Sequence, residues 1–253
     1  MKKFISILCV IIIVTAIFTS NSYASSDKNS IFIEKEFVID NIDSYSRSVV
    51  KIMVYHVKDD KTIDYINKGS GFYIDNNLIV TAAHYFIDND GMVMTDVIRY
   101  SYAIYSRGFS ARIVSIDIEN DICILAPTSN DFMRAKTLDI DYEAKVSTDE
   151  QCYTVGYPDG EFSLINVKYE YNKEISVEVF KNAIHQDSAY CFSTDVNVDD
   201  ASKTQGLSGG PIINSNGKAV AIEGYSDKSH VYGINLEVLK IMVDRYNDIK
   251  DEV

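Results

Sequence analysis

The sequence has few cysteines, and their number excludes one class of protein. The chain holds four cysteines in 253 residues, far fewer than a small disulfide-stapled domain contains. Cys9 lies in the N-terminal apolar run, so three remain, and an odd number cannot be fully paired within one chain. Cys123 lies in an apolar run and is expected to be a small buried hydrophobe. Cys152 and Cys191 could pair with each other or stay free.

Basic charge is also scarce. The chain has 24 Lys and Arg residues against 37 Asp and Glu residues, a net charge of −13. Without Lys2 and Lys3, the only charged residues among the first 24, the remainder carries −15. A surface this acidic disfavours binding to nucleic acid or to an anionic membrane. We therefore expect neither as a partner, and attribute the charge to solubility.

Long hydrophobic runs are absent, with one exception at the N-terminus. The run Phe4–Phe18 follows two lysines and is shorter than the ~20 residues that cross a bilayer. Ser22 and Ala24 then place small residues where signal peptidase reads. We predict a signal peptide at residues 1–24 and a secreted protein, retained or not at the cell surface, with no membrane span after cleavage. Residues 25–45 would form an N-terminal arm or propeptide.

Short segments rich in β-branched and aromatic residues fill most of the remaining chain, separated by turn signals such as Asn214–Gly217. The expected strands are 49–57, 71–74, 78–82, 93–98, 101–105, 112–116 and 122–125, then, after a polar connection, 152–155, 162–171, 175–179, 189–194, 211–213 and 219–225. From Leu236 onward, apolar residues recur at spacings of three and four, which predicts a helix.

These segments form two β clusters of about equal size followed by one helix. Closing each cluster on itself would hide its edge strands. We therefore predict an all-β fold of two antiparallel β-barrels with a C-terminal α-helix. The first barrel would span residues 46–135, the second residues 136–235, and the helix residues 236–253.

Three segments carry residues suited to acyl transfer. His84 ends a strand pair, Asp121 stands directly before an apolar strand, and Ser208 lies in a glycine-rich turn. A serine hydroxyl needs a neighbouring histidine to take its proton, and the histidine needs a carboxylate to hold its tautomer. The same turn can direct the N–H groups of Gly206 and Ser208 at one point, where they would stabilise an oxyanion. Asp117, four residues earlier, is the alternative acid.

At these segments the sequence resembles the chymotrypsin-like serine proteases. The matching motifs are Thr81-Ala-Ala-His84, Asp121-Ile-Cys-Ile-Leu125 and Gly206-Leu-Ser208-Gly-Gly-Pro211, in the family's order. The resemblance covers residues 47–250 and is strongest to exported bacterial members, the glutamyl endopeptidases and Deg-type proteases. It implies two barrels, a secreted serine endopeptidase acting on protein or peptide substrates, and a catalytic triad of His84, Asp121 and Ser208.

The sequence departs from the family at two places beside the site. Tyr85 stands where many animal members have a cysteine, so that disulfide is absent. Leu207 replaces the aspartate or asparagine that is common before the serine. Without that aspartate, activation by a new N-terminus that pairs with it cannot operate. The resemblance leaves open what holds the oxyanion turn in shape.

We expect Glu223 and Lys203 to belong to the substrate pocket and to set the substrate preference. Glu223 falls where glutamyl endopeptidases have a histidine that binds an acidic side chain. A buried glutamate there would repel an acidic substrate and favour a basic one. Lys203, five residues before Ser208, could pair with Glu223 and cancel its charge, or both side chains could face solvent.

Two other functions compete with the protease reading. The pattern Gly206-x-Ser208-x-Gly210 also fits the nucleophile elbow of α/β-hydrolases, but Gly-Gly-Pro follows the serine instead of a helix. A catalytically silent, trypsin-like binding protein, as found among toxins and adhesins, would normally have lost one of the three residues.

No cofactor or metal is implied. His56, His185 and His230 have no motif around them, and no close spacing of His, Cys and acidic residues suggests zinc. No cysteine has glycine-rich turn chemistry around it, which disfavours a cysteine protease. We expect a monomer.

Overall fold

The computed structural model describes residues 42–58, 60–88, 92–93, 97–101, 108–128, 135–179, 182–194, 204–227 and 230–250. All of them belong to one compact unit, residues 40–253. The predicted signal peptide, most of the predicted arm and Lys203 lie outside the described residues. Within the described part, no helix is long and apolar enough to cross a membrane.

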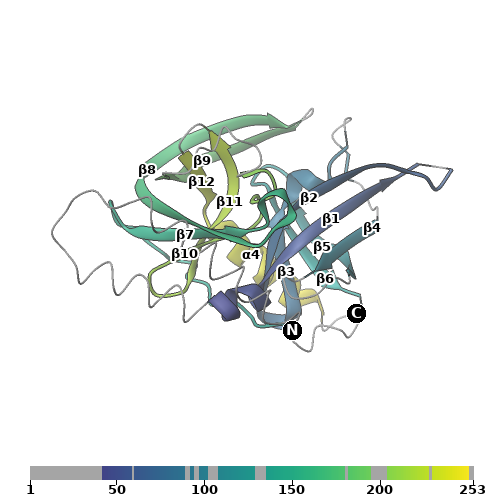
Figure 1. Cartoon of the computed structure of the whole chain (residues 1–253), viewed down its shortest axis with the longest axis horizontal. Helices are drawn as coiled ribbons and strands as arrows, with labels where there is room; N and C mark the ends of the chain where they lie inside the picture. Colours follow the sequence, from purple (N-terminus) through teal and green to yellow (C-terminus); the bar gives the residue numbers. More distant parts are fainter. Residues whose placement is uncertain are drawn as a thin grey trace, which may run out of the picture. The chain divides into compact units, whose positions relative to one another are not determined.

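Two closed antiparallel barrels of six strands each form the fold (Figure 1). The first, in spatial order β1-β2-β3-β6-β5-β4, is built from β1 (Val49–Val57), β2 (Ile63–Ile74), β3 (Leu78–Ala82), β4 (Val97–Ser101), β5 (Phe109–Asp117) and β6 (Ile122–Pro127). The second, in spatial order β10-β11-β12-β9-β8-β7, is built from β7 (Gln151–Gly156), β8 (Ser163–Val179), β9 (Asn182–Ser193), β10 (Pro211–Asn214), β11 (Ala219–Asp227) and β12 (His230–Ile234). The predicted fold class is confirmed.

Alternation along the strands fills the barrels and the space between them. In β1, Val50, Ile52 and Val54 point into the first barrel, as expected for every second residue of a strand. A separate apolar cluster joins both barrels, with Val80 from β3 and Ile222 from β11 among its members. This shared core lets side chains from both barrels meet at one site.

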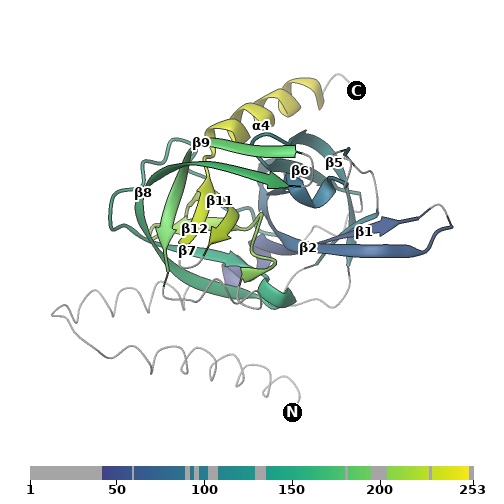
Figure 2. The same ribbon diagram turned by 90° about the horizontal axis from the view of Figure 1, so that it is seen from above.

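The C-terminal helix α4 (Glu237–Lys250) covers part of that shared core from outside (Figure 2). Asn235 caps it, because its side-chain oxygen accepts the N–H of Glu237 at 2.7 Å. Leu239 and Val243 pack into the cluster, whereas Ile249 is exposed at the far end of the predicted apolar face. The helix is confirmed.

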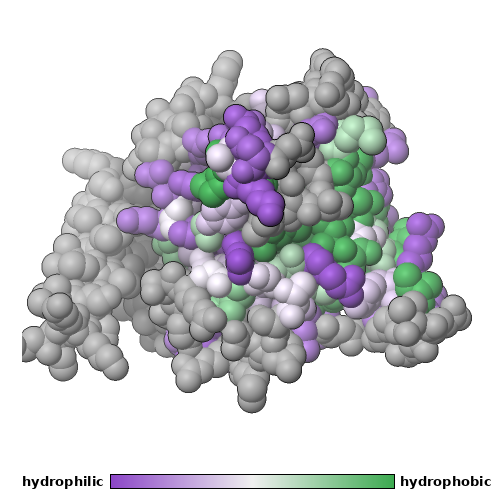
Figure 3. Space-filling model, turned by 90° about the vertical axis from the view of Figure 1, so that its right-hand side faces the viewer, coloured by the Kyte–Doolittle hydropathy of each residue, from purple (hydrophilic) through white to green (hydrophobic). Residues whose placement is uncertain are grey.

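The β1–β2 hairpin is longer than the sequence indicated. Strand β2 begins at Ile63, not at the predicted residue 71, and its first six residues are exposed or half-buried. Figure 3 views the side on which this hairpin projects and shows apolar and hydrophilic residues mixed there. Val57, Ile63 and Ile66 are the exposed large apolar residues of the hairpin. The first half of β2 contributes little to a core, so the alternation that marks a strand is missing from its sequence.

Three further strands, β8, β4 and β12, differ from the prediction. The segments 162–171 and 175–179 are parts of one strand, β8, whose register shifts at Tyr169/Tyr171 and Lys173/Ile175. Such bulges interrupt the period-2 pattern. Strand β4 spans Val97–Ser101 and overlaps both predicted strands, 93–98 and 101–105, of which residues 94–96 and 102–105 lie outside the described residues. Strand β12 was not predicted.

Candidate active site

His84 and Asp121 form a hydrogen-bonded pair at the edge of the first barrel. His84 lies on the 3-10 helix η2 (Ala83–Phe86), directly after β3. Its ring Nδ1 lies 2.9 Å from Oδ2 and 3.2 Å from Oδ1 of Asp121, and its backbone N–H donates to the same Oδ1 at 2.8 Å. The two bonds from one residue fix the ring relative to the carboxylate.

The backbone around Asp121 supports this pairing. Asp121 is buried and has a positive φ of 55°, in a turn that ends where β6 begins. Its carbonyl accepts the N–H of Ala83 at 3.2 Å, so the two segments are joined by backbone as well as side chain. Asp117, the alternative acid, instead caps its own turn by accepting the N–H of Asn120 at 2.9 Å. Asp121, not Asp117, contacts His84.

Opposing effects set the pKa of His84. Burial is the largest single effect and lowers the pKa of the imidazole. The charge of Asp121, the hydrogen bond to Asp121 and the charge of Glu223 outweigh burial and raise the pKa of His84 above its usual value. An imidazole with a raised pKa is a stronger base than an ordinary histidine side chain.

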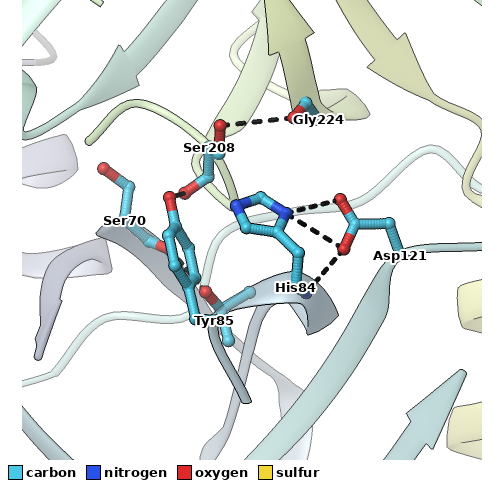
Figure 4. Close-up of polar contacts among 7 residues, drawn as sticks. Ser70, His84, Tyr85, Asp121, Ser208 and Gly224 are labelled. Atoms are coloured by element: carbon cyan, nitrogen blue, oxygen red, sulfur yellow. Dashed lines mark hydrogen bonds and ion pairs between the residues drawn. The ribbon is translucent and has the colours of Figure 1, made fainter. Parts of the chain in front are cut away.

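Ser208 lies opposite His84 (Figure 4), in the turn that precedes β10 of the second barrel. Its hydroxyl donates to the carbonyl of Gly224 on β11 at 3.3 Å. Figure 4 shows hydrogen bonds from His84 to Asp121 and from Ser208 to Gly224, and none between His84 and Ser208. The structure therefore brings the three predicted residues together, with the hydroxyl turned toward β11.

Two glycines give the turn a shape that other residues could not adopt. Gly206 has a φ of 105°, and a Cβ there would lie 2.6 Å from the carbonyl oxygen of Tyr157. Gly209 has a φ of 83°, and a Cβ there would lie 2.3 Å from the carbonyl oxygen of Ser70. Both positions require glycine, for backbone angle and for space. Among the described turns and loops, neither Gly206 nor Ser208 donates its N–H to the backbone carbonyl of a described residue.

Ser70, from the first barrel, holds this turn in place. Its hydroxyl donates to the carbonyl of Gly206 at 2.5 Å and accepts the N–H of Tyr157 at 2.9 Å. Its own N–H donates to the carbonyl of Ser208 at 2.9 Å. Ser70 is buried, so one side chain links the first barrel to two segments of the second.

Tyr85 is the second support of the turn. Its hydroxyl donates to the carbonyl of Ser208 at 3.1 Å. Its ring fills the space above Gly69, where a Cβ would lie 2.2 Å from the ring. Burial raises the pKa of Tyr85 well above its usual value, so the hydroxyl stays a donor. The sequence analysis noted Tyr85 only because it stands in place of a cysteine, and it gave Ser70 no role. Neither role could be predicted, because both side chains form hydrogen bonds with residues more than a hundred positions away.

Glu223 is buried beside the nucleophile, 1% exposed. Burial is the main cause that raises its pKa to about 7, while the Ser208 side chain and His84 lower it and Asp121 raises it. The solvent-facing alternative for this residue is therefore wrong. Lys203, its predicted neighbour, lies outside the described residues.

One group of described residues has the ligand types of a metal site. The donor atoms of Glu170, Cys191 and His230 lie within 4.8 Å of one another, on β8, β9 and β12. The sequence spacing gave no sign of this group because its members are far apart in the chain. An ion pair of 3.5 Å between His230 Nε2 and Glu170 Oε2 accounts for two of the three without a metal.

The three described cysteines are in no disulfide. Cys123, Cys152 and Cys191 are all buried, and Cys152 and Cys191 are not bonded to each other. Burial raises the pKa of the Cys123 thiol well above its usual value and that of Cys152 to about 12. Neither of these two thiols is a nucleophile at neutral pH.

Comparison with known proteins agrees with this geometry. The family model of the trypsin-like peptidase domain matches residues 69–222. Among solved structures, the active form of the Rv3671c protease from M. tuberculosis superposes with a TM-score of 0.65 at 20% identity, over 88% of each chain. The inactive form gives a TM-score of 0.61 at 20% identity, over 88% of this chain and 98% of that one. These two share the fold with this chain. No curated protein matches the chain in sequence.

Proposed function

Because the chain belongs to the trypsin-like peptidase family, we propose that it is a serine endopeptidase that cleaves peptide bonds through an acyl-enzyme on Ser208. The observation that carries this proposal is the His84–Asp121 pair facing a serine in a glycine-shaped turn. A carboxylate, an imidazole, a serine and the backbone amides of the serine's turn are the groups that acyl transfer needs.

In the proposed first step, the hydroxyl oxygen of Ser208 attacks the substrate carbonyl carbon and its proton passes to Nε2 of His84. Nδ1 carries the hydrogen that faces Asp121, which leaves Nε2 as the basic atom of the neutral ring. The hydroxyl first rotates from the Gly224 carbonyl toward His84, a change between staggered side-chain rotamers. The amides of Gly206 and Ser208 stabilise the oxyanion.

The second half of the reaction reverses the proton path. The carbon–nitrogen bond breaks, and the amine leaves with the proton that His84 had taken. Water then gives a proton to His84 and adds its oxygen to the acyl carbon. The ester bond to Ser208 breaks, Ser208 regains a proton from His84, and the new carboxylic acid is released.

A fluorophosphonate probe tests this proposal directly, because it reacts only with an assembled nucleophile, base and oxyanion site. We expect intact-mass spectrometry to show one adduct on the wild-type protein and none on Ser208→Ala. Peptide hydrolysis should follow the same pattern. Full activity of Ser208→Ala would refute the proposal. Absence of any adduct, with the N-terminal arm present or trimmed, would favour the catalytically silent binding protein.

We also propose that the protein is exported and cleaved after Ala24. The support is the N-terminal sequence, in which a basic start, a short apolar run and small residues follow one another. Mass spectrometry of the mature protein should find Ser25 at its N-terminus. A protein that keeps residues 1–24 would contradict the proposal.

A further inference from the structure

The backbone of Glu223 is tied to the nucleophile turn. Its carbonyl accepts the N–H of Gly209 at 2.7 Å, and its N–H donates to the carbonyl of Gly210 at 2.8 Å. The next residue, Gly224, accepts the hydroxyl of Ser208. Glu223 therefore keeps a fixed position beside Ser208 whichever way the Ser208 hydroxyl turns.

The Glu223 carboxyl group shares a side-chain hydrogen bond with Ser208, but one of its two oxygens has hydrogen-bonding capacity that the protein leaves unused. The residue is 1% exposed, and its Oε2 has no hydrogen-bond partner among the described residues. No ion pair of the described residues includes it either: its charged neighbours are His84 and the like-charged Asp121. A buried carboxylate oxygen without a donor is costly, and the cost is removed by a donor or cation brought from outside.

We propose that Glu223 is a specificity-determining residue that selects substrates with a lysine or arginine on the acyl side of the cleaved bond. The inference rests on the proposed peptidase function. The substrate carbonyl must come within bonding distance of Ser208 Oγ, which now contacts the carbonyl of Gly224. The side chain of the same substrate residue is then next to β11, within reach of Glu223. A lysine ammonium or arginine guanidinium would supply both the missing donor and the missing positive charge.

This selection should depend on pH. Among the described residues, four groups face Glu223: His84 and Tyr85 from η2, Asp121 from the turn before β6, and Ser208 from the glycine turn. Burial raises the pKa of Glu223 to about 7, so the carboxyl is largely neutral at pH 6 and charged at pH 8. The preference for a cationic side chain should therefore grow as the pH rises through 7.

Matched peptide substrates that differ only between arginine and citrulline test this inference, because citrulline keeps the shape of arginine without its charge. We expect kcat/KM for the wild-type protein at pH 8 to favour arginine by about 100-fold, the order measured for closely paired buried charges. The ratio should fall to below about 5-fold in Glu223→Gln, and be several-fold smaller at pH 6 than at pH 8 in the wild type. The control Glu237→Gln makes the same change on the exposed surface of α4 and should keep the wild-type ratio.

The wild-type ratio alone can overturn the inference, even if Glu223→Gln does not fold. A ratio near one, or a preference for glutamate or aspartate in a peptide library, would exclude a cation-selecting Glu223. An unchanged ratio in folded Glu223→Gln, judged by its reaction with the fluorophosphonate probe, would exclude it too.

Binding of benzamidine, a small amidinium, separates this inference from the proposed reaction. Calorimetry on Ser208→Ala should show binding that is lost in Ser208→Ala/Glu223→Gln. If the wild type neither hydrolyses peptides nor reacts with the probe but this binding pattern holds, the peptidase proposal fails and the cation site stands. If hydrolysis occurs and benzamidine binds both variants equally, only the cation site fails.

Discussion

The two barrels share one architecture and differ in how completely they prepare their part of the site. The first barrel supplies His84 and Asp121, which are locked together by side-chain and backbone hydrogen bonds. The second supplies Ser208, whose hydroxyl is turned to Gly224, and Glu223, which keeps an unused oxygen. The acid–base half is therefore assembled before substrate binds, whereas the nucleophile half still has a rotation to make and a charge to neutralise.

The largest expected effect comes from breaking the assembled half. We expect Asp121→Asn to lower kcat/KM by about 10⁴-fold, because the amide cannot hold the required tautomer of His84. The measurement is hydrolysis of a peptide substrate at pH 8. Asp117→Asn is the matched control, since Asp117 only caps its own turn, and it should stay within about 3-fold of the wild type. A larger loss in Asp117→Asn than in Asp121→Asn would show that Asp117, and not Asp121, is the acid that supports His84.

In the half of the site that the second barrel supplies, the burial of Glu223 predicts that the stability of the protein depends on pH. The folded protein raises the pKa of Glu223 from 4.5 to about 7, so between these values the folded state binds more protons than the unfolded state. Stability from this group is therefore greatest below pH 4.5 and is lost as the pH rises to about 7. The cost at pH 8 is about 3 kcal/mol.

Urea unfolding of the wild type and Glu223→Gln at pH 5 and pH 8 measures this term. From pH 5 to pH 8, the unfolding free energy of the wild type should fall by slightly less than about 3 kcal/mol relative to that of Glu223→Gln. The fall is not complete because pH 5 already lies between the unfolded and folded pKa values of Glu223. Glu237→Gln should show no such change. A relative stability that does not vary with pH would mean that Glu223 keeps an ordinary carboxyl environment.

A smaller effect is expected at the junction between the barrels. Ser70→Ala should cost about 2 kcal/mol of unfolding free energy, because it leaves the buried N–H of Tyr157 and carbonyl of Gly206 without their partner. It should also lower kcat by about 10²-fold, since the turn that carries Ser208 loses its support. Thermal unfolding and peptide hydrolysis measure the two effects.

Ser48→Ala is the control for Ser70→Ala. Ser48 is also buried, but its hydroxyl only donates to the carbonyl of Ser44 within the same helical turn. It should lose stability without a comparable loss of kcat. Equal changes in kcat for the two variants would show that Ser70 is not a support of the turn.

The sequence was sufficient for the barrels and for the residues that carry motifs. Closed barrels follow from strand pattern, and His84, Asp121 and Ser208 stand in short segments whose neighbours are informative. Asp121 was separated from Asp117 by one local feature, the apolar strand that begins directly after it. Each of these inferences uses residues within a few positions of one another.

What the sequence could not supply depends on contacts between distant segments. Ser70 contacts Gly206 across 136 positions, and Tyr85 contacts Ser208 across 123, so no local pattern reveals either support. The burial of Glu223 is likewise a property of the assembled second barrel. Strand β12 was missed because it is short and contains Gly233, which has no side chain to continue the alternation.

The smallest predicted effect concerns the hydroxyl of Tyr85. Tyr85→Phe removes one donor to the Ser208 carbonyl, but the N–H of Ser70 still donates to that oxygen at 2.9 Å. The ring also keeps its place over Gly69. We therefore expect a loss of about 1 kcal/mol in stability and roughly 5-fold in kcat.

That loss should be the same at every pH from 6 to 9, because burial raises the pKa of Tyr85 well above its usual value and keeps the hydroxyl neutral. Tyr190→Phe is the control: its hydroxyl donates to the carbonyl of Ala144 at 2.8 Å, far along the chain from the Ser208 turn. It should lose similar stability and no kcat. If both variants lost kcat equally, the hydroxyl of Tyr85 would have no specific part in positioning Ser208. Ser70 would then be the side chain of the first barrel that positions the Ser208 turn.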